Sequence, residues 1–205
     1  MMLFHSEGGN VSKLVYCIAL TLSVLLLIPA SLQAKGDPKA ALKAGEIIVT
    51  SKKLKKFPRP GVKAVGVIDA PMERIWPLID QCKDYTKTMQ RILKSKEISR
   101  KGNEVICEIT VDLPFPLGDI SSQTVATHTV KQGKLYKRSW KLLSGDYEYN
   151  EGSWTLVPFE GSPARTLVVY ETQVQPNTMI PDSIRAMAQK KTLPELFEHL
   201  RNQVK

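Results

Sequence analysis

The sequence has few of the residues that most metal centres and many active sites need. Its 205 residues include only three histidines and three cysteines. Neither Cys82 nor Cys107 has a histidine near it in the sequence, so a cysteine–histidine metal site is not predicted. The chain also lacks the Gly-Xaa-Ser-Xaa-Gly, His-Glu-Xaa-Xaa-His and phosphate-loop motifs. We therefore expect no metal and no cofactor, and we assign no catalytic residue.

Aromatic residues are also scarce, at 7% of the chain, although the net charge is +9. Positive charge attracts both nucleic acid and anionic lipid. The one dense basic cluster consists of Lys52, Lys53, Lys55, Lys56, Arg59 and Lys63. It lacks the aromatic platforms on which single-stranded nucleic acid stacks. We predict no nucleic-acid partner and only weak contact of this basic cluster with an anionic membrane surface.

Long apolar runs are absent except near the N-terminus, where residues 14–30 carry no charge and follow Lys13. This run is slightly shorter than the ~20 residues that a membrane-spanning helix prefers. Ala34 precedes Lys35 as a signal-peptidase site requires. We predict that residues 1–34 are a cleaved signal peptide and that the protein is exported, to the periplasm. Leu32 stands where a small residue is usual, so an inner-membrane anchor formed by residues 14–30 is the alternative.

Residues 35–45 are small and polar and are predicted to form a flexible or loosely helical leader. Residues 46–205 are predicted to form one folded domain. Short strands are predicted over 46–50 and 62–69. A helix should follow, with Asp69 as its cap and Pro71 at its start. Pro77 predicts a bend or a fresh helix start within it.

After this helix the apolar pattern changes to a period of two residues. The predicted strands are 92–99, 104–113, 121–130, 135–142, 151–157 and 166–174. Short turns between them favour an antiparallel meander. Residues 181–204 carry an apolar stripe typical of a helix, which Pro194 should kink. The order predicts an α+β domain in which a curved antiparallel sheet wraps around a long C-terminal helix.

Alternation along the strands turns several polar side chains inward, including Tyr136, Arg138, Trp140 and Tyr170. Such groups are costly to bury without partners. They either orient a ligand in an apolar cavity or reach backbone carbonyls in an ordinary core, and the residues alone favour the core. The two cysteines also fall on apolar faces. They form either a disulfide, which an oxidising compartment would permit, or two separate buried thiols.

Five segments of the sequence carry a resemblance to a known family. They are DAPMERIW, VDLPFPLGD, GSWTLVP, TLVVYETQVQP and IPDSI followed by LPELFEHLR. Their order and spacing over about residues 45–203 resemble the START/polyketide cyclase (SRPBCC) superfamily, with the greatest similarity to its coenzyme Q-binding and polyketide-cyclase-like branch. The resemblance implies a helix-grip fold with an internal hydrophobic cavity. In many relatives a basic residue follows the aspartate that Asp119 matches, whereas this chain has Ile120.

The cavity that the resemblance implies leads us to predict a set of ligand-binding residues. The set is Ile109, Val111, Tyr136, Arg138, Trp140, Trp154, Leu156, Val168, Tyr170, Met179, Ile180, Ile184 and Met187. The helix of residues 70–85, with Trp76, is expected to be structural. His199 is expected to form a surface pair with Glu195.

Two functions compete. The preferred one is a monomeric, non-enzymatic binder or carrier of a hydrophobic small molecule such as a lipid, quinone or polyketide-like compound. The alternative is a cyclase or hydrolase of the same superfamily, for which His128, Arg138, Tyr136 and Tyr170 are the acid–base candidates. A protein-interaction module is a third class, which no sequence feature supports.

Overall fold

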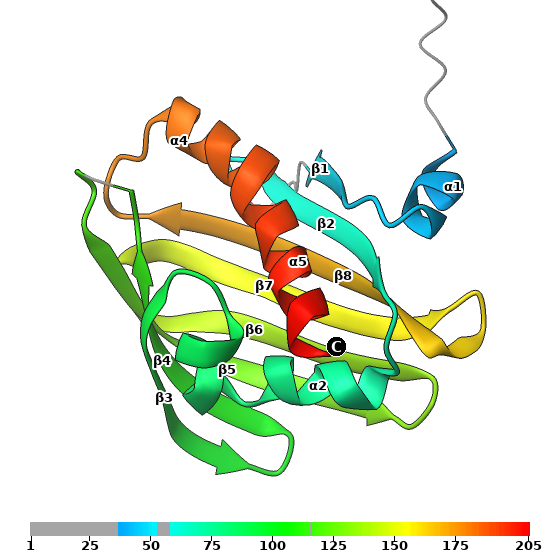
Figure 1. Ribbon diagram of the computed structural model, residues 1–205. Coiled ribbons are helices and arrows are strands. Elements are labelled where there is room, and N and C mark those ends of the chain that lie inside the picture. The colour runs from blue at the N-terminus through cyan, green and yellow to red at the C-terminus, as the bar shows by residue number, and fades with distance from the viewer. Residues whose placement is uncertain (1–36, 53–57, 115) are drawn as a thin grey trace, which may run out of the picture. The chain divides into compact units, whose positions relative to one another are not determined.

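The structure is a computed structural model that describes residues 37–52, 58–114 and 116–205 (Figure 1). The predicted signal peptide lies outside these residues, and so do Lys53, Lys55 and Lys56 of the basic cluster. Within the predicted leader, helix α1 (Pro38–Lys43) is capped by Asp37. No helix in the described part of the chain has both the length and the apolar character needed to cross a bilayer.

In the described part of the chain, eight strands form one antiparallel sheet in the order β1-β2-β8-β7-β6-β5-β4-β3. Their bounds are β1 Ile48–Lys52, β2 Gly61–Ile68, β3 Ile92–Lys101, β4 Glu104–Asp112, β5 Asp119–Lys131, β6 Leu135–Gly145, β7 Tyr147–Phe159 and β8 Ser162–Pro176. Strands β3 to β8 follow one another across the sheet, so the predicted meander is confirmed. The predicted first strand is displaced by two residues along the chain.

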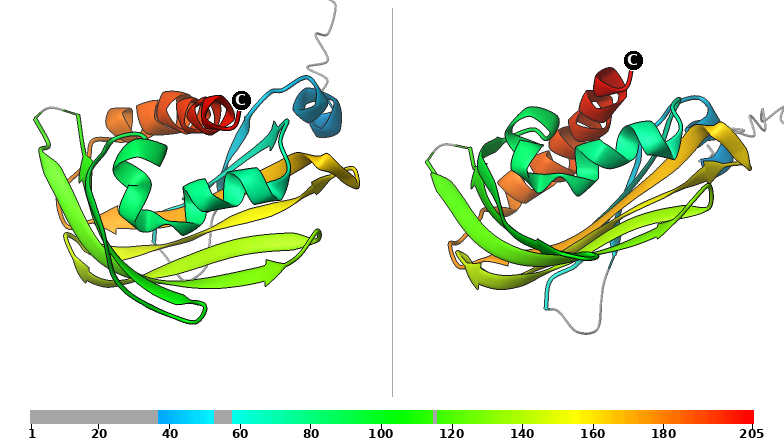
Figure 2. Two further views of the ribbon diagram at one scale, coloured as in Figure 1. Left: turned by 60° about the horizontal axis from the view of Figure 1, so that its bottom comes forward. Right: turned by 90° about the horizontal axis from the view of Figure 1, so that it is seen from below.

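The sheet is curved, and the helices lie on its concave side (Figure 2). Helix α2 (Met72–Asp80) and the short helices η1 (Cys82–Asp84) and α3 (Tyr85–Thr88) connect β2 to β3. The C-terminal segment comprises α4 (Asp182–Met187), the π-helical turn η2 (Ala188–Thr192) and α5 (Leu193–Gln203), and it crosses the same face (Figures 1 and 2). The predicted helix-grip α+β fold is confirmed.

The N-terminal cap of helix α2 differs from the prediction. Pro71 occupies the N-cap position without a side-chain cap, whereas Asp69 accepts a hydrogen bond from Nε of Arg165 at 2.6 Å. The predicted cap at Asp69 is therefore wrong. Pro77 lies inside the helix, so no new helix starts there, and the alternative of a bend stays a prediction. Burial of Ile75 and Ile79 against the sheet offsets the hydrogen bond that the proline removes.

The C-terminal segment changes from α-helical to π-helical over Ala188–Thr192, just before Pro194, and the predicted kink stays a prediction. A proline in the first turn of α5 has no N–H to donate, and its ring would clash with the carbonyl four residues earlier. The wider π-helical turn η2 immediately precedes this position. This π-helical turn separates α5, which packs on the core, from α4, which lies over the C-terminal end of β8 (Figure 1).

The core lies between the concave face, helix α2 and helix α5. Phe197 and Leu200 of α5 are fully buried, as are Ile75 and Ile79 of α2. Helix α5 approaches strand β2 at Gly66, where a Cβ atom would lie only 2.7 Å from Cδ1 of Phe197. Only glycine leaves room for this approach. The prediction that α2 is structural agrees with its burial.

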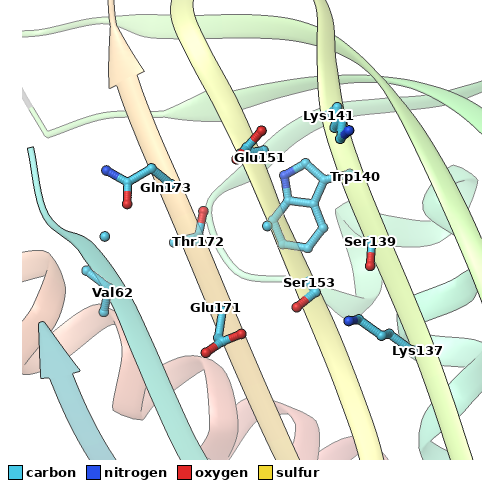
Figure 3. A pocket seen from close by; sticks show the side chains of 12 residues that line it. Val62, Lys137, Ser139, Trp140, Lys141, Glu151, Ser153, Glu171, Thr172 and Gln173 are labelled. Carbon is cyan, nitrogen blue, oxygen red and sulfur yellow. The ribbon is translucent and has the colours of Figure 1, made fainter. Parts of the chain in front are cut away.

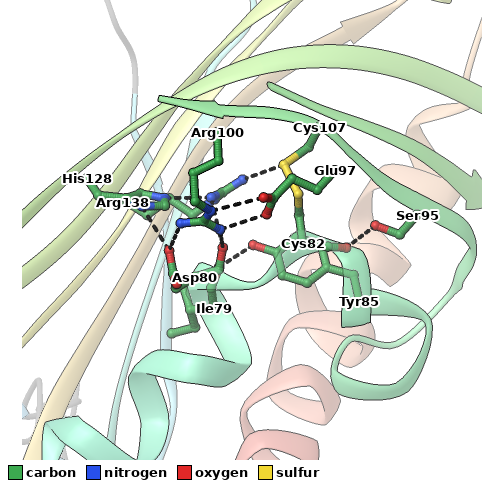
Figure 4. The surroundings of a disulfide bond; sticks show 10 residues. All are labelled: Ile79, Asp80, Cys82, Tyr85, Ser95, Glu97, Arg100, Cys107, His128 and Arg138. Carbon is green, nitrogen blue, oxygen red and sulfur yellow. Dashed lines mark hydrogen bonds and ion pairs between the residues drawn. A yellow bond between two sulfur atoms is a disulfide. The ribbon is translucent and has the colours of Figure 1, made fainter. Parts of the chain in front are cut away.

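Cys82 and Cys107 form a disulfide, so the structure decides between the two alternatives that the sequence leaves open (Figure 4). Their Cα atoms are 6.3 Å apart, and both residues are fully buried. The bond connects the segment after α2 to strand β4. It fixes one end of the helical layer to the sheet.

Candidate ligand-binding cavity

A cavity of about 620 Å³ lies between the sheet and the start of the C-terminal helical segment. This volume falls in the range of ~300–1,000 Å³ that is usual for small-molecule sites. One wall comes from β8, through Tyr170, Thr172 and Val174. Helix α4 covers the cavity with Ile184 and Met187. The wall surfaces are predominantly apolar, so the site suits an apolar ligand.

Five of the predicted binding residues line this cavity. They are Val111, Tyr170, Ile180, Ile184 and Met187. They come from β4, β8 and the region of α4, which are far apart in the sequence. The cavity therefore exists only because the C-terminal segment folds back over both strands. That these residues contact a ligand stays a prediction.

Most of the other predicted residues face inward but do not line the cavity. Trp154, Leu156 and Val168 belong to the buried core, and Ile109 packs against it at the margin. At Trp154 the reason is that Phe197 of α5 packs against the indole, with ring centroids 6.1 Å apart, and so fills the space above it. Met179 does not line the cavity either, because 88% of its surface is exposed. Alternation predicted which face each strand residue occupies but not what covers it.

Tyr136 is buried beneath helix α2 rather than in the cavity. Its hydroxyl lies 2.8 Å from Oε1 of both Glu73 and Gln132. Its ring packs edge-on against Trp76, with centroids 5.5 Å apart. These partners satisfy the phenol, so Tyr136 connects α2 to β6 as part of the core.

Arg138 is only 3% exposed and lies in a polar network beside the disulfide (Figure 4). One terminal nitrogen lies 2.6 Å from Nε2 of His128, and the other donates to Sγ of Cys107 at 3.2 Å. Nδ1 of His128 is 2.9 Å from Asp80. Three of the four acid–base candidates, His128, Arg138 and Tyr136, thus have structural partners outside the cavity lining.

Tyr170 is the acid–base candidate that does line the cavity. Its ring contacts Trp154, with centroids 4.4 Å apart, and stacks on Trp140 at 5.9 Å. Burial raises the pKa of the Tyr170 phenol, and burial also raises that of Tyr147, which lines the same cavity. Both phenols are therefore neutral near pH 7 and supply hydrogen-bonding groups rather than charge.

Trp140 lines a second hollow of about 230 Å³, over strands β6, β7 and β8 (Figure 3). This hollow is more polar and includes Lys137, Ser139, Ser153 and Thr172. The indole Nε1 donates to Oδ1 of Asn150 at 3.0 Å. Trp140 therefore supports Tyr170 from the side without reaching the large cavity.

Sequence reasoning did not predict the charged groups around the large cavity. Arg59, Arg91, Asp112, Asp182 and Arg185 all line it. They come from the β1–β2 connection, the start of β3, the end of β4 and helix α4. In the sequence these residues are charged positions within apolar or irregular segments. Solvent-exposed residues show the same pattern, so the sequence does not distinguish the two.

The structure also places the predicted His199–Glu195 pair and the residues that could hold a metal ion. His199 does not pair with Glu195, whose carboxylate lies 4.0 Å from Lys191 instead, so that predicted pair is wrong. His199 lies 3.4 Å from the carbonyl of Lys87. Among the described residues, no three histidine, cysteine, aspartate or glutamate side chains are grouped so that they could hold a metal ion.

Residues 68–201 match the family described as polyketide cyclase / dehydrase and lipid transport. The chain belongs to this family. The match covers most of the region of the predicted START-like domain, and the resemblance noted from the sequence is confirmed. A comparison with curated protein sequences found no match.

Solved structures of the same fold come from bacteria and humans. A STAR-related lipid transfer protein from Xanthomonas axonopodis is 14% identical, with a TM-score of 0.63 over 77% of this chain and 93% of that chain. Human StAR-related lipid transfer protein 5 is 10% identical, with a TM-score of 0.68 over 78% and 82%. The Zhui aromatase/cyclase from Streptomyces sp. R1128 is 11% identical, with a TM-score of 0.55 over 77% and 94%. At these identities the likeness shows the fold.

Proposed function

We propose that this protein is an exported carrier of a hydrophobic small molecule, such as a lipid, quinone or polyketide-like compound. The observation that carries the proposal is the apolar cavity of about 620 Å³ between the sheet and helix α4. Removing apolar ligand surface from water contributes ~25 cal/mol per Å², so burial alone supplies affinity. Two of the structurally similar proteins are described as lipid transfer proteins, which supports the same class of ligand.

Helix α4 is the part of the wall that can act as a lid. It is six residues long and is separated from α5 by the π-helical turn η2. Its Met187 lines the cavity and is 39% exposed. A flexible, polarisable methionine suits an adaptable apolar surface. A ligand would enter when α4 moves away from β8 while α5 stays packed on the core.

An enzymatic function has less support. Acid–base catalysis needs titratable groups placed at the reacting atoms. Of the four candidates, only Tyr170 reaches the cavity, and burial raises the pKa of its phenol away from neutrality. The similarity to an aromatase/cyclase keeps the enzyme as the second candidate.

Export is supported by two independent features. The uncharged run of residues 14–30 and Ala34 fit a cleaved signal peptide. The disulfide between Cys82 and Cys107 is a bond that persists in oxidising compartments such as the periplasm.

The direct test is native mass spectrometry and lipid extraction of the protein purified from its own cell envelope. We expect a co-purifying apolar molecule whose mass does not change on incubation with the protein. Val111→Trp should reduce its recovery by filling the cavity, whereas Leu143→Trp, at an exposed position away from the cavity, should not. Repeated recovery of no molecule would refute the carrier, and conversion of the molecule would favour the enzyme.

A further inference from the structure

The charged side chains that line the large cavity carry more positive than negative charge. Three are arginines, Arg59, Arg91 and Arg185, and two are aspartates, Asp112 and Asp182. The cavity is otherwise predominantly apolar. A group of cations at an apolar cavity is costly unless anions offset it. The contacts of each aspartate therefore decide how much of the arginines' positive charge stays unpaired and can bind a ligand.

Arg91 and Asp112 form a pair that is complete by itself. Arg91 donates from Nε to the carbonyl of Asp112 at 3.0 Å and from a terminal nitrogen to its carboxylate at 2.9 Å. Two hydrogen bonds to one residue fix the guanidinium in place. This pair stabilises the end of the β3–β4 hairpin that is opposite its connecting turn, and it leaves little unpaired positive charge for a ligand.

Asp182 is a weak partner for the other two arginines. Its Oδ1 lies 3.8 Å from a terminal nitrogen of Arg59 and 3.8 Å from Nε of Arg185. These distances are too long for hydrogen bonds. The aspartate side chain is 94% exposed, so water screens its charge. One solvated carboxylate thus faces two guanidinium groups.

Arg185 is the more buried of the two arginines, with 23% of its side chain exposed, against 48% for Arg59. Its Nε donates to the carbonyl of Ile180 at 3.1 Å. Within the described parts of the chain, its two terminal nitrogens have no hydrogen-bond partner. Burial, followed by the charge of Arg59, lowers the pKa of Arg185 from its ordinary value. The guanidinium is still charged at neutral pH.

We propose that the cavity takes an amphiphile with an anionic headgroup, a carboxylate or a phosphate, which binds Arg185 and Arg59. The inference rests on the proposed carrier function and narrows its ligand class. The free terminal nitrogens of Arg185 match the paired oxygens of a carboxylate or phosphate. A neutral ligand would bury this guanidinium further without supplying a negative charge to offset its own.

The arrangement on helix α4 explains how one ligand meets both kinds of surface. Arg185 lies between Ile184 and Met187 in the sequence, and all three line the cavity. The headgroup would lie at Arg185 near the rim, and the chain would extend along Ile184 toward Tyr170. A ligand whose headgroup binds Arg185 and whose chain packs on Ile184 would keep helix α4 closed over the cavity.

The test compares two fluorescent probes that differ only in headgroup charge, cis-parinaric acid and its methyl ester. The protein is purified after expression of the full chain and is then delipidated. We expect the acid to bind at least tenfold more tightly than the ester. Arg185→Gln should weaken binding of the acid about tenfold and that of the ester less than twofold, because only the carboxylate of the acid forms an ion pair with the guanidinium. Arg59→Gln should act in the same direction.

Two variants serve as controls. Asp182→Asn should strengthen binding of the acid about threefold, because it removes the competing carboxylate. Arg165→Gln removes an arginine that pairs with Asp69 outside the cavity lining and should change neither probe. Equal binding of acid and ester, with no effect of Arg185→Gln, would overturn the anionic headgroup but leave the carrier function standing. Binding of neither probe would overturn both.

A competition experiment separates an amphiphile from a free anion. Dodecyl phosphate is expected to displace parinaric acid, whereas dodecanol at the same concentration should displace little. Inorganic phosphate should have no effect in this range. If inorganic phosphate displaced the probe as well as dodecyl phosphate does, the arginines would form a free-anion site and the proposed ligand class would be wrong.

Discussion

Nδ1 of His128 lies 2.9 Å from Oδ1 of Asp80, and this contact joins strand β5 to the last residue of helix α2. Arg100 on β3 donates to the same Oδ1 at 2.9 Å. The disulfide lies beside them (Figure 4). Together these groups fix the end of α2 to the sheet. They explain why polar residues predicted as cavity wall are structural.

The first prediction concerns acid stability. Burial would raise the pKa of Asp80, but the hydrogen bonds from His128 and then Arg100 lower it from 3.8 to about 2. A carboxyl group whose pKa falls on folding stabilises the native state above its unfolded pKa, and this contribution is lost as the pH falls toward 2. We expect Asp80 to contribute about 2 kcal/mol above pH 5.

Urea unfolding between pH 5 and pH 2 measures this contribution. The difference in free energy of unfolding between wild type and Asp80→Asn should narrow below pH 4. Asp182→Asn, at an exposed aspartate, is the matched control and should keep the wild-type pH dependence. Parallel curves for wild type and Asp80→Asn would contradict the assignment.

The second prediction is that the Cys82–Cys107 disulfide stabilises the native state. The two residues are 25 positions apart. Closing a loop of this size lowers the conformational entropy of the unfolded chain and so stabilises the native state by about 3 kcal/mol. The double variant Cys82→Ala, Cys107→Ala should show this loss in urea unfolding. Thiol titration of the unreduced, denatured wild type should find neither cysteine free, and two free thiols would refute the bond.

The third prediction compares the two tryptophans that contact Tyr170, namely Trp154 in the core and Trp140 beside the smaller hollow. Trp154 is 4% exposed and contacts Phe197, so Trp154→Ala should cost about 3–5 kcal/mol in unfolding free energy. Trp140 is partly exposed and lines the smaller hollow, so Trp140→Ala should cost clearly less. Because Trp140 stacks on Tyr170, its loss should still alter binding of an apolar fluorescent probe. A collapse of stability with unchanged probe binding would contradict this.

The fourth prediction concerns the basic cluster. Each basic residue near an anionic membrane contributes ~1 kcal/mol, and salt screens it. We expect weak binding to anionic vesicles at low salt, measured by co-sedimentation, that is lost when Lys52, Lys53, Lys55 and Lys56 become Gln. Neutral vesicles are the control. Binding that survives the four changes would show that another surface meets the membrane.

The fifth prediction concerns processing. The protein isolated from cells should begin at Lys35, because Ala34 follows an uncharged apolar run. N-terminal sequencing of the envelope fraction checks this. An intact Met1 in that fraction would support the membrane anchor instead, and an intact Met1 in the cytosol would refute export.

The order of elements, the antiparallel meander and the family could all be predicted from the sequence. These depend on local signals, namely the period of the apolar residues and the turn residues between strands. Even the faces of β6 could be predicted, since Tyr136 and Arg138 are both buried on the concave side. Pro77 shows a limit of local rules, because it lies inside α2 without starting a new helix.

Which inward residues line the cavity depends on how the whole domain folds. Alternation tells which side of the sheet a residue occupies, but the curvature of the sheet and the path of α5 decide whether a helix fills the space above it. Trp154 and Tyr170 are neighbours on one face, yet only Tyr170 lines the cavity. Arg59 and Arg185 meet at Asp182 from distant parts of the chain. No local pattern encodes such a meeting, because it depends on the fold of the whole domain.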